Sequence, residues 1–245
     1  MSGITIGIIG VLAGLALIAL RVPIAVSLGL VSFLGIIELT NVRAAWGIIT
    51  AVPFNFIGNW SFTAVPMFLL MGYICTTSGM TTGLFRAMRV CLSRLPGGLA
   101  IASVGACSMF AAASGSSVAT ASAMARIAVP EMLRHNYNPG LSTGVIAASG
   151  TLGSLIPPSI LMVLYGVYAE VSIGKLFMAG FLPGLLSAAL YVAMIISRVK
   201  VNPELAGEIV ESFSAKEKWE AIREVWALPA LIVFVLGGIF AGFFT

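Results

Sequence analysis

Charged residues are scarce in this chain, and aspartate is absent from it altogether. Only 9% of the 245 residues are charged and 59% are hydrophobic, with a mean hydropathy of +1.07, whereas soluble domains carry about 25% charged residues. This composition excludes a soluble globular domain. It predicts an all-α polytopic membrane protein with transmembrane helices, because about 20 apolar residues span a bilayer as a helix. The apolar stretches are residues 3–20, 22–39, 61–79, 141–169, 173–197 and 225–244.

Cysteine is also rare, which argues against metal and redox chemistry. Cys75, Cys91 and Cys107 have no CxxC spacing and lie in or beside apolar segments. We interpret them as packing residues, with no transition metal and no redox role. The net charge of +4 comes from lysines and arginines in loops, so it does not indicate a nucleic-acid partner.

Carboxylates are missing from the middle of every apolar stretch. Glu38, Glu131 and Glu170 lie at segment ends, and the other six glutamates lie within residues 199–224. Proton relays in transporters generally use an ionisable residue inside the membrane, so we do not expect a proton relay here. The six glutamates within residues 199–224 are Glu204, Glu208, Glu211, Glu217, Glu220 and Glu224.

What the chain does contain is a membrane-length segment that is interrupted in its middle. In GTLGSLIPPS, residues 150–159, two glycines weaken a helix, and Pro157 and Pro158 lack backbone N–H groups and clash with the preceding turn. In hydrocarbon, irregular backbone is tolerated only where it faces protein or a water-filled cavity. Discontinuous helices of this kind hold substrates and coupling ions in secondary transporters, so the segment predicts a binding site.

A second unusual segment, residues 97–134, is rich in Ala, Ser and Gly. Small residues let helices approach closely in lipid, and the polar cluster at residues 114–117 lies at the middle of the segment. Each half has about 16 residues, which is short for a full crossing. We therefore predict a re-entrant helical hairpin with its turn at residues 114–117. Two short tilted helices packed through small residues are the alternative.

Together these two segments predict a cation site built without carboxylates. Ser114, Ser116 and Ser117 offer hydroxyl oxygens, and the interruption at residues 150–158 offers backbone carbonyls. Neutral oxygens suit a hard monovalent cation, and helix N-termini at such breaks attract an anion. We expect sodium as the coupling ion and an anionic substrate.

The distribution of basic residues predicts the orientation in the membrane. If residues 97–134 enter and leave on one side, ten of the 13 lysines and arginines fall on one face, and only Arg43 and Lys175 fall on the other. The positive-inside rule then places the N-terminus outside and residues 198–224 in the cytoplasm. Arg126, within the hairpin, is expected to extend toward the cytoplasmic interface. Arg126 and Ser117 are also candidates for substrate binding.

Two further segments mix apolar and polar residues in other patterns. Residues 40–60 carry aromatic side chains among polar groups and predict an amphipathic helix in the outer membrane interface. Residues 199–224 are the one strongly polar stretch and predict a solvated cytoplasmic linker helix.

An enzymatic function is not expected. AASG at 112–115 resembles the serine turn of rhomboid-type intramembrane proteases, which need a histidine within hydrogen-bond reach of the serine. The single histidine, His135, lies in the charged turn RHNYNPG. A hairpin arm would hold it about 25 Å from Ser114, at 1.5 Å per residue. We therefore interpret His135 as a solvated loop residue.

Four motifs follow one another with characteristic spacing: ASGSSVATASAMARIAVPEM at 113–132, HNYNPG at 135–140, GTLGSLIPPSILMVLYG at 150–166 and LFMAGFLPG at 176–184. They resemble the large membrane subunit of tripartite ATP-independent periplasmic (TRAP) transporters of the dicarboxylate and sugar-acid type. The similarity covers nearly the whole chain. Ala125 and Asn136 depart from it, since each stands where we expect glycine.

The resemblance implies one repeat of an inverted-repeat, elevator-type transporter in the bacterial inner membrane, with a periplasmic N-terminus. It implies sodium-driven import of a C4-dicarboxylate or sugar acid, delivered by a periplasmic binding protein, with a small membrane subunit bracing the large one. Residues 1–60 would be scaffold, and residues 61–197 would be the transport region. Carried over by motif, the sodium site uses Ser114 and Ser116 with the carbonyls of Gly153, Ile156 and Pro158.

Large subunits of this family are usually much longer than this chain. We therefore expect an N-terminal half, from a truncated sequence or a split gene, in which residues 225–245 begin a second repeat. Two alternatives stay open. One is a sodium-coupled anion carrier that needs no binding protein, and the other is a half-subunit or scaffold that does not transport.

Overall fold

The computed structural model describes residues 3–207 and 213–243, which form helices and no strands. The all-helical fold is thus confirmed for the described residues. The chain divides into two compact units, residues 1–60 and 61–245. The boundary lies where the sequence places the end of the first region, and the functional roles of the two regions stay predictions.

The first unit contains three helices that follow the hydrophobic pattern closely. Helices α1 (Gly3–Ala19) and α2 (Ile24–Leu39) pack against each other, and Pro23 directly precedes α2. Helix α3 (Val42–Ile57) begins where the Asn41 side chain accepts a hydrogen bond from the Ala44 N–H at 2.8 Å, a standard N-cap. Helix α3 confirms a helix within residues 40–60. Its place in the membrane interface stays a prediction.

The short η1 (Trp60–Thr63) spans the boundary between the units, and α4 (Ala64–Thr77) and α5 (Met80–Leu92) follow it in the second unit. Helix α5 is a structural element that we did not predict, because its arginines suggested a loop. It buries Leu84, Phe85, Ala87 and Val90 and exposes Arg86. This spacing of three and four residues is that of an amphipathic helix, so the pattern was present in the sequence.

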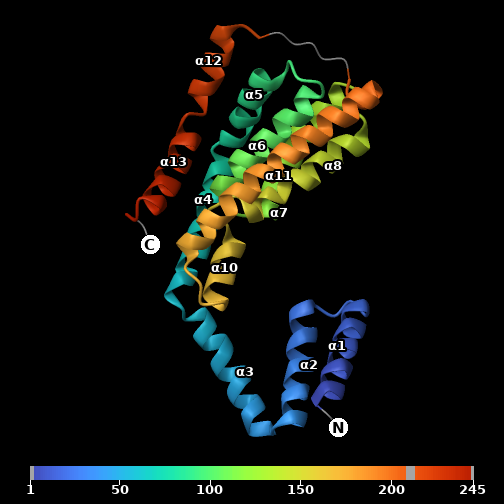
Figure 1. The fold of residues 1–245 in the computed structure, drawn as a ribbon, viewed down its shortest axis with the longest axis vertical. Helices are drawn as coiled ribbons and strands as arrows, with labels where there is room; N and C mark the ends of the chain where they lie inside the picture. The colour runs from blue at the N-terminus through green and yellow to red at the C-terminus, as the bar shows by residue number, and fades with distance from the viewer. Residues whose placement is uncertain (1–2, 208–212, 244–245) are drawn as a thin grey trace. The chain divides into compact units, whose positions relative to one another are not determined.

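The hairpin of α6 (Gly98–Ser114) and α7 (Ser117–Arg134) forms the centre of the second unit. Fourteen of the 17 residues of α6 are buried, as expected of a helix that is apolar or small on every side. Figure 1 shows α6 flanked by α5, α7 and α11. The predicted hairpin is therefore present. Whether it is re-entrant depends on its depth in the membrane and stays a prediction.

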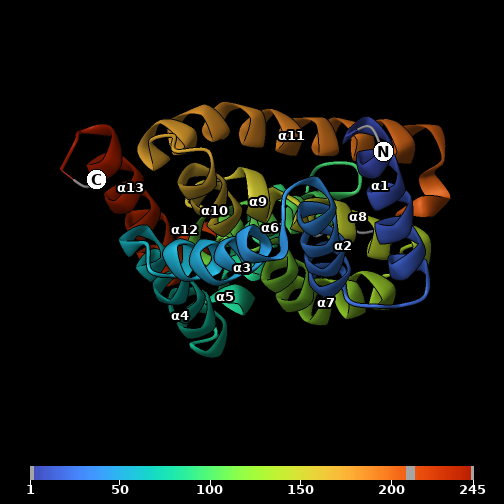
Figure 2. The same cartoon turned by 90° about the horizontal axis from the view of Figure 1, so that it is seen from below.

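The interrupted segment consists of α8 (Pro139–Gly150), α9 (Leu152–Leu155) and α10 (Ile160–Tyr168). The chain bends by 42° between α9 and α10, which places the interruption at the two prolines. Helix α11 (Ile173–Val201) has 29 residues and runs along one side of the second unit, next to α9 and α10 (Figure 2).

The polar region after α11 differs from the single linker helix that we expected. Helix α11 ends at Val201, the short η2 (Pro203–Leu205) follows, and α12 (Ala215–Glu224) begins at a capping box between Ser214 and Glu217. Asn202 leaves the helical conformation with a ψ of 87°, and Pro203 cannot continue a helix, so a continuous helix over 199–224 is wrong. Glu208 and Glu211 lie outside the described residues.

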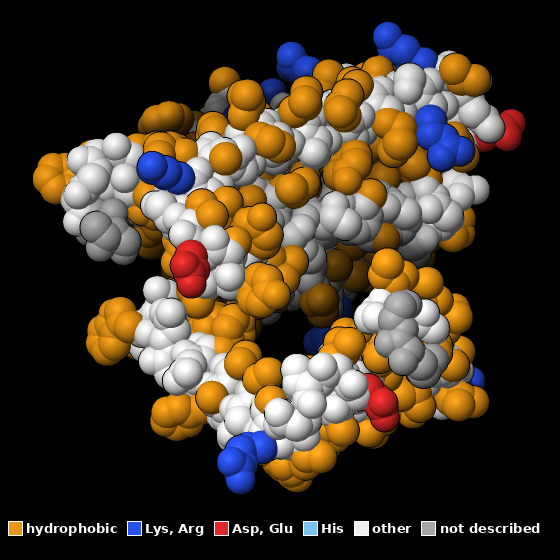
Figure 3. Space-filling view, turned by 60° about the horizontal axis from the view of Figure 1, so that its bottom comes forward, with side chains coloured by type: hydrophobic (Ala, Val, Ile, Leu, Met, Phe, Trp, Pro, Cys, Tyr) orange, Lys and Arg blue, Asp and Glu red, His pale blue; other side chains and the backbone are white. Residues whose placement is uncertain are grey.

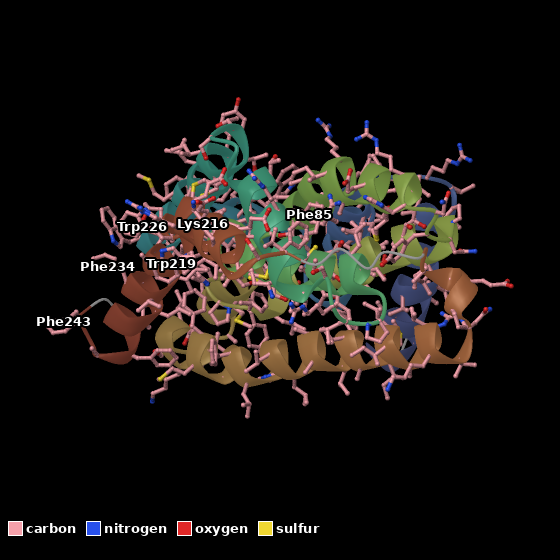
Figure 4. The ribbon with its side chains drawn as sticks, turned by 90° about the horizontal axis from the view of Figure 1, so that it is seen from above. Phe85, Lys216, Trp219, Trp226, Phe234 and Phe243 are labelled. Atoms are coloured by element: carbon pink, nitrogen blue, oxygen red, sulfur yellow. The ribbon has the colours of Figure 1, made fainter. Side chains whose placement is uncertain are left out.

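Helix α13 (Ala227–Phe240) follows α12 directly, and the two are bent by 56°. Figure 4 shows the labelled Trp219, Trp226, Phe234 and Phe243 toward the outer edge of these helices, where all four are exposed, whereas Phe85 of α5 is buried. Exposed aromatic rings of this kind suit a surface that meets lipid or headgroups.

The surface of both units agrees with a membrane protein. Hydrophobic side chains are spread over the whole face in Figure 3, among white surface, and charged ones are few. Two described helical stretches, Trp60–Thr77 and Ile173–Val201, are long and apolar enough to cross a membrane. There are four if the bent pairs α8–α10 and α12–α13 each form one span. Helices α1, α2, α3 and α6 are apolar but shorter.

Candidate functional site

The turn of the hairpin, residues 114–117, is called the hairpin tip below. Helix α6 ends at Ser114, Gly115 has a left-handed φ of 60°, and α7 begins at Ser117. Between them Ser116 is extended, and its hydroxyl accepts a hydrogen bond from the Ala119 N–H at 3.3 Å. The predicted turn is confirmed, and Ser116 also has a structural role as the N-cap of α7.

The hydroxyl of Ser114 is buried inside the hairpin. Its Oγ lies 2.9 Å from Thr120 Oγ1 and 3.5 Å from the Ser116 carbonyl oxygen. Both Ser114 and Thr120 are fully buried. Thr120 was not singled out from the sequence, although its position four residues after Ser116 places it one turn into α7 on the same face. The tip therefore carries several oxygens within a small buried volume.

The second part of the site is the helix break, residues 150–159. Ile156 leaves the helical conformation with ψ of 122°, and its N–H donates to the Leu152 carbonyl at 2.8 Å. Four residues after Gly153 stands Pro157, which has no N–H to give to the Gly153 carbonyl. The break thus removes the helical N–H donors that the carbonyls of Gly153 and Ser154 would otherwise have, and the Ser154 carbonyl accepts a hydrogen bond from the Ser159 hydroxyl instead.

The tip and the break pack directly on each other through backbone. A Cβ atom on Gly153 would lie 2.7 Å from the carbonyl carbon and oxygen of Ser116, so only glycine fits there. A Cβ on Gly115 would lie 2.7 Å from the Pro158 carbonyl oxygen, and the Gly115 carbonyl accepts a hydrogen bond from the Ile160 N–H at 3.0 Å. Two segments about 40 residues apart are therefore held in one backbone contact.

This contact brings together most of the residues that the sequence nominates for sodium. Ser114 and Ser116 form the tip, and Gly153 and Pro158 lie against it. Ile156 lies between Gly153 and Pro158 in the chain. Its side chain faces α11, where a Cβ on Gly184 would lie 2.8 Å from it. The structure supports the proximity of these residues, and their binding of sodium stays a prediction.

The two substrate candidates lie in different places. Ser117 is half-buried at the tip, and its backbone nitrogen would lie 2.8 Å from a Cβ on Gly153. Arg126 is exposed on α7, about 15 Å along the helix from Ser116 at 1.5 Å per residue. Ser117 is thus adjacent to the candidate site, whereas Arg126 is remote from it along the hairpin.

The opposite end of the hairpin carries charges. Arg89 of α5 forms an ion pair with Glu131 of α7, and His135 Nε2 lies 3.4 Å from Glu131 Oε1 and 3.2 Å from an Arg89 nitrogen. Arg134 lies 3.7 Å from the same carboxylate. We call these four residues the hairpin base. The interpretation of His135 as a solvated loop residue is wrong, because the C-terminal end of α7 places its ring in this cluster, with only 28% of the side chain exposed.

Two other residues of the base also lower the pKa of Glu131. Partial burial raises the pKa of this carboxyl, but the positive charge of Arg89 and hydrogen bonds from Arg89 and His135 outweigh burial and hold the pKa below its usual value. His135 stands at the far end of α7 from Ser114, which agrees with the rejection of a serine–histidine pair.

Comparison with known proteins places this chain in a family. Residues 11–245 match the family described as tripartite ATP-independent periplasmic transporter, DctM component. The C4-dicarboxylate TRAP transporter large permease protein DctM of Vibrio cholerae is 40% identical over 229 residues, covering 91% of this chain and 49% of the relative. The protein of the same name from Pseudomonas aeruginosa is 41% identical over 189 residues, covering 76% and 43%.

A relative named for a different solute also matches. The sialic acid TRAP transporter large permease protein SiaM of Vibrio cholerae is 31% identical over 189 residues, covering 77% of this chain and 44% of the relative. The chain thus spans about half the length of the curated relatives it matches. The resemblance seen in the motifs is confirmed: this chain belongs to the DctM family, the large permease component of tripartite ATP-independent periplasmic transporters.

Proposed function

We propose that this chain forms part of a large permease subunit that imports an anionic solute by sodium-coupled secondary transport. It works in the bacterial inner membrane with a small membrane subunit and a periplasmic substrate-binding protein. Its N-terminus is periplasmic and residues 198–224 are cytoplasmic. The observation that carries the proposal is the backbone contact between the hairpin tip and the helix break.

The oxygens at this contact suit a small hard cation. Hydroxyls of Ser114 and Ser116 and carbonyls of Gly153, Ile156 and Pro158 are neutral ligands, and no glutamate lies within residues 97–130 or 139–169. Hard cations prefer such oxygens, and transporter helix breaks use freed carbonyls for sodium. A proton carrier would instead need an ionisable group at the site.

The same contact supports an anionic solute. Helices α7 and α10 both begin there, at Ser117 and Ile160, while α6 and α9 end there, at Ser114 and Leu155. Helix N-termini present partial positive charge and C-termini partial negative charge. Cation and anion therefore have separate, adjacent sets of backbone groups. A C4-dicarboxylate or sugar acid fits this scheme, and the relatives named for C4-dicarboxylate and sialic acid transport support both classes.

The two units have different roles in this proposal. Residues 1–60 form scaffold, and residues 61–197 carry the tip and the break and move as the transport region of an elevator-type carrier. The packing of α6 at the centre of the second unit supports this view, because a moving domain must keep its site intact.

The proposal is tested in the assembled transporter that contains this chain, reconstituted in proteoliposomes with its binding protein. Uptake of radiolabelled succinate and sialic acid is measured with sodium and with potassium in its place. We expect uptake of one of them in sodium and none in potassium. Sodium-independent uptake would contradict coupling, and uptake without the binding protein would favour the alternative of an independent symporter.

A pair of glycines on α8 and α9 tests the site itself. Gly153→Ala places a Cβ 2.7 Å from the Ser116 backbone, whereas a Cβ on Gly144 meets nothing within 4 Å. We expect Gly153→Ala to abolish uptake and Gly144→Ala to leave it close to wild type. Equal uptake by the two variants would remove the tip–break contact from the mechanism.

A further inference from the structure

Two buried hydroxyls have no hydrogen-bond partner within the described part of the chain, those of Ser93 and Ser149. Ser149 lies in α8 and is completely buried. A helical serine can donate to the carbonyl four residues before it, and Ser142 of the same helix does so, to the Asn138 carbonyl at 3.0 Å. Buried polar groups are nearly always paired, and an exception calls for an explanation such as a water molecule or an ion.

The position of Ser149 points toward the candidate cation site. Thr151, which joins α8 to α9, keeps a helical conformation, so Ser149 and Gly153, four residues apart, lie on one face, one turn apart. Gly153 lies against the Ser116 backbone, and a Cβ on Gly150, the next residue after Ser149, would lie 2.6 Å from the side chain of Ala121 in α7. Helix α8 packs against both arms of the hairpin. The unpaired hydroxyl therefore lies on the hairpin side of α8, one turn from the tip.

On the hairpin, the polar atoms at the same level are also hydroxyls. Ser114 and Thr120 are buried and hydrogen-bonded to each other at 2.9 Å. No carboxylate stands within residues 97–130 or 139–169, so a bound cation would depend on neutral oxygens alone. Each additional oxygen then contributes directly to affinity.

We propose that the Ser149 hydroxyl is a further oxygen donor of this cation site, acting on the ion directly or through one bound water. The inference rests on the proposed sodium coupling and adds a residue that the motif resemblance does not include. Ser93 provides the contrast. It is the C-cap of α5, next to Arg94 and remote in the chain from the tip and the break.

The alternative explanation is that Ser149 is a tolerated defect of packing. In that case Ser149→Ala removes a buried unpaired hydroxyl, which stabilises the protein or leaves it unchanged, and sodium dependence stays as in wild type. If the hydroxyl serves the cation, the same substitution weakens sodium binding. Ser149→Cys separates oxygen chemistry from size, because sulfur fills a similar volume but is a soft ligand, poorly suited to a hard cation.

The experiment measures uptake by the assembled transporter as a function of sodium concentration at saturating substrate. We expect Ser149→Ala and Ser149→Cys to raise the sodium concentration for half-maximal uptake about tenfold, the scale seen when a supporting metal-site residue is lost. Ser142→Ala, on the same helix and equally buried, and Ser93→Ala should keep the wild-type value.

A second readout covers variants with low uptake. Sodium added to the purified complex in detergent should raise the melting temperature of wild type and of Ser142→Ala more than that of Ser149→Ala or Ser149→Cys. Wild-type sodium dependence with unchanged half-saturation and thermal shift in the Ser149 variants would overturn this inference alone. Absence of sodium dependence in the wild type would overturn the proposed function as well, so the two failures are distinguishable.

Discussion

The two ends of the α6–α7 hairpin are held in opposite ways. At the tip, Gly115 and Gly153 let backbone meet backbone, and the side chains involved are neutral. At the base, two arginines and a histidine surround the carboxylate of Glu131. Neither chemistry would serve at the other end.

The difference follows from what each end has to do. The backbone contacts at Gly115 and Gly153 leave no room for a Cβ atom, so they define the positions of the neighbouring carbonyls closely. Ionised side chains are flexible, and they are costly inside a membrane, so they suit the end that we predict to lie at the membrane interface. The hairpin is therefore held by ion pairs between side chains at the base and by close backbone packing at the tip.

The largest effect is expected from breaking the tip. Gly115→Ala puts a Cβ into a left-handed conformation, which costs about 1–2 kcal/mol, and places it 2.7 Å from the Pro158 carbonyl oxygen. We expect uptake by the assembled transporter to be lost. The control is Gly79→Ala, which has a similar φ of 78° but open space around its Cβ. If Gly79→Ala lowers uptake as much, backbone strain and not the tip–break contact is responsible.

A smaller effect is expected from breaking the base. Glu131→Gln removes the charge that pairs with Arg89, and we expect a loss of about 1–2 kcal/mol of stability, because the pair is only partly buried. The melting temperature in detergent should fall by a few degrees, while the sodium concentration for half-maximal uptake stays as in wild type. A changed sodium response would show that base and tip are coupled, against the separation described above.

Low pH should weaken the base, which contains a carboxylate, and not the tip, which contains none. The pKa of Glu131 is lower in the folded protein than its usual value of 4.5, so its contribution to stability is present above about pH 4.5 and is lost as the pH falls through the folded pKa. We expect the melting temperature to decrease below pH 4.5 in wild type and to decrease less in Glu131→Gln. Identical curves for the two proteins would mean that the base does not account for the acid sensitivity.

The smallest effect is expected at an exposed ion pair. Arg86 lies 3.5 Å from Glu224 of α12, with 70% and 54% of the two side chains exposed. Surface pairs of this kind contribute about 0–1 kcal/mol. We expect the melting temperature of Arg86→Ala to stay within about 2 °C of wild type, which calibrates the larger loss predicted for Glu131→Gln.

Much of the fold was predictable from the sequence because its signals are local. The hairpin turn, the interruption at Pro157 and Pro158, and the long apolar helix α11 all follow from residue type and spacing. Helix α5 was missed because its arginines suggested a loop, although the spacing of its buried residues indicated an amphipathic helix. The prediction of a single linker helix was wrong because the polarity of this stretch does not indicate that α11 ends at Val201.

Residue type alone indicates where the chain is irregular, because a proline has no N–H and a glycine tolerates left-handed φ wherever it stands. Which irregular segments meet follows from the packing of the helices. The placement of Gly153 against Ser116, of His135 beside Arg89, and the burial of the Ser149 hydroxyl without a partner among the described residues depend on helix packing over tens of residues. Such contacts result from the fit of whole helix faces, which no local pattern of residues specifies.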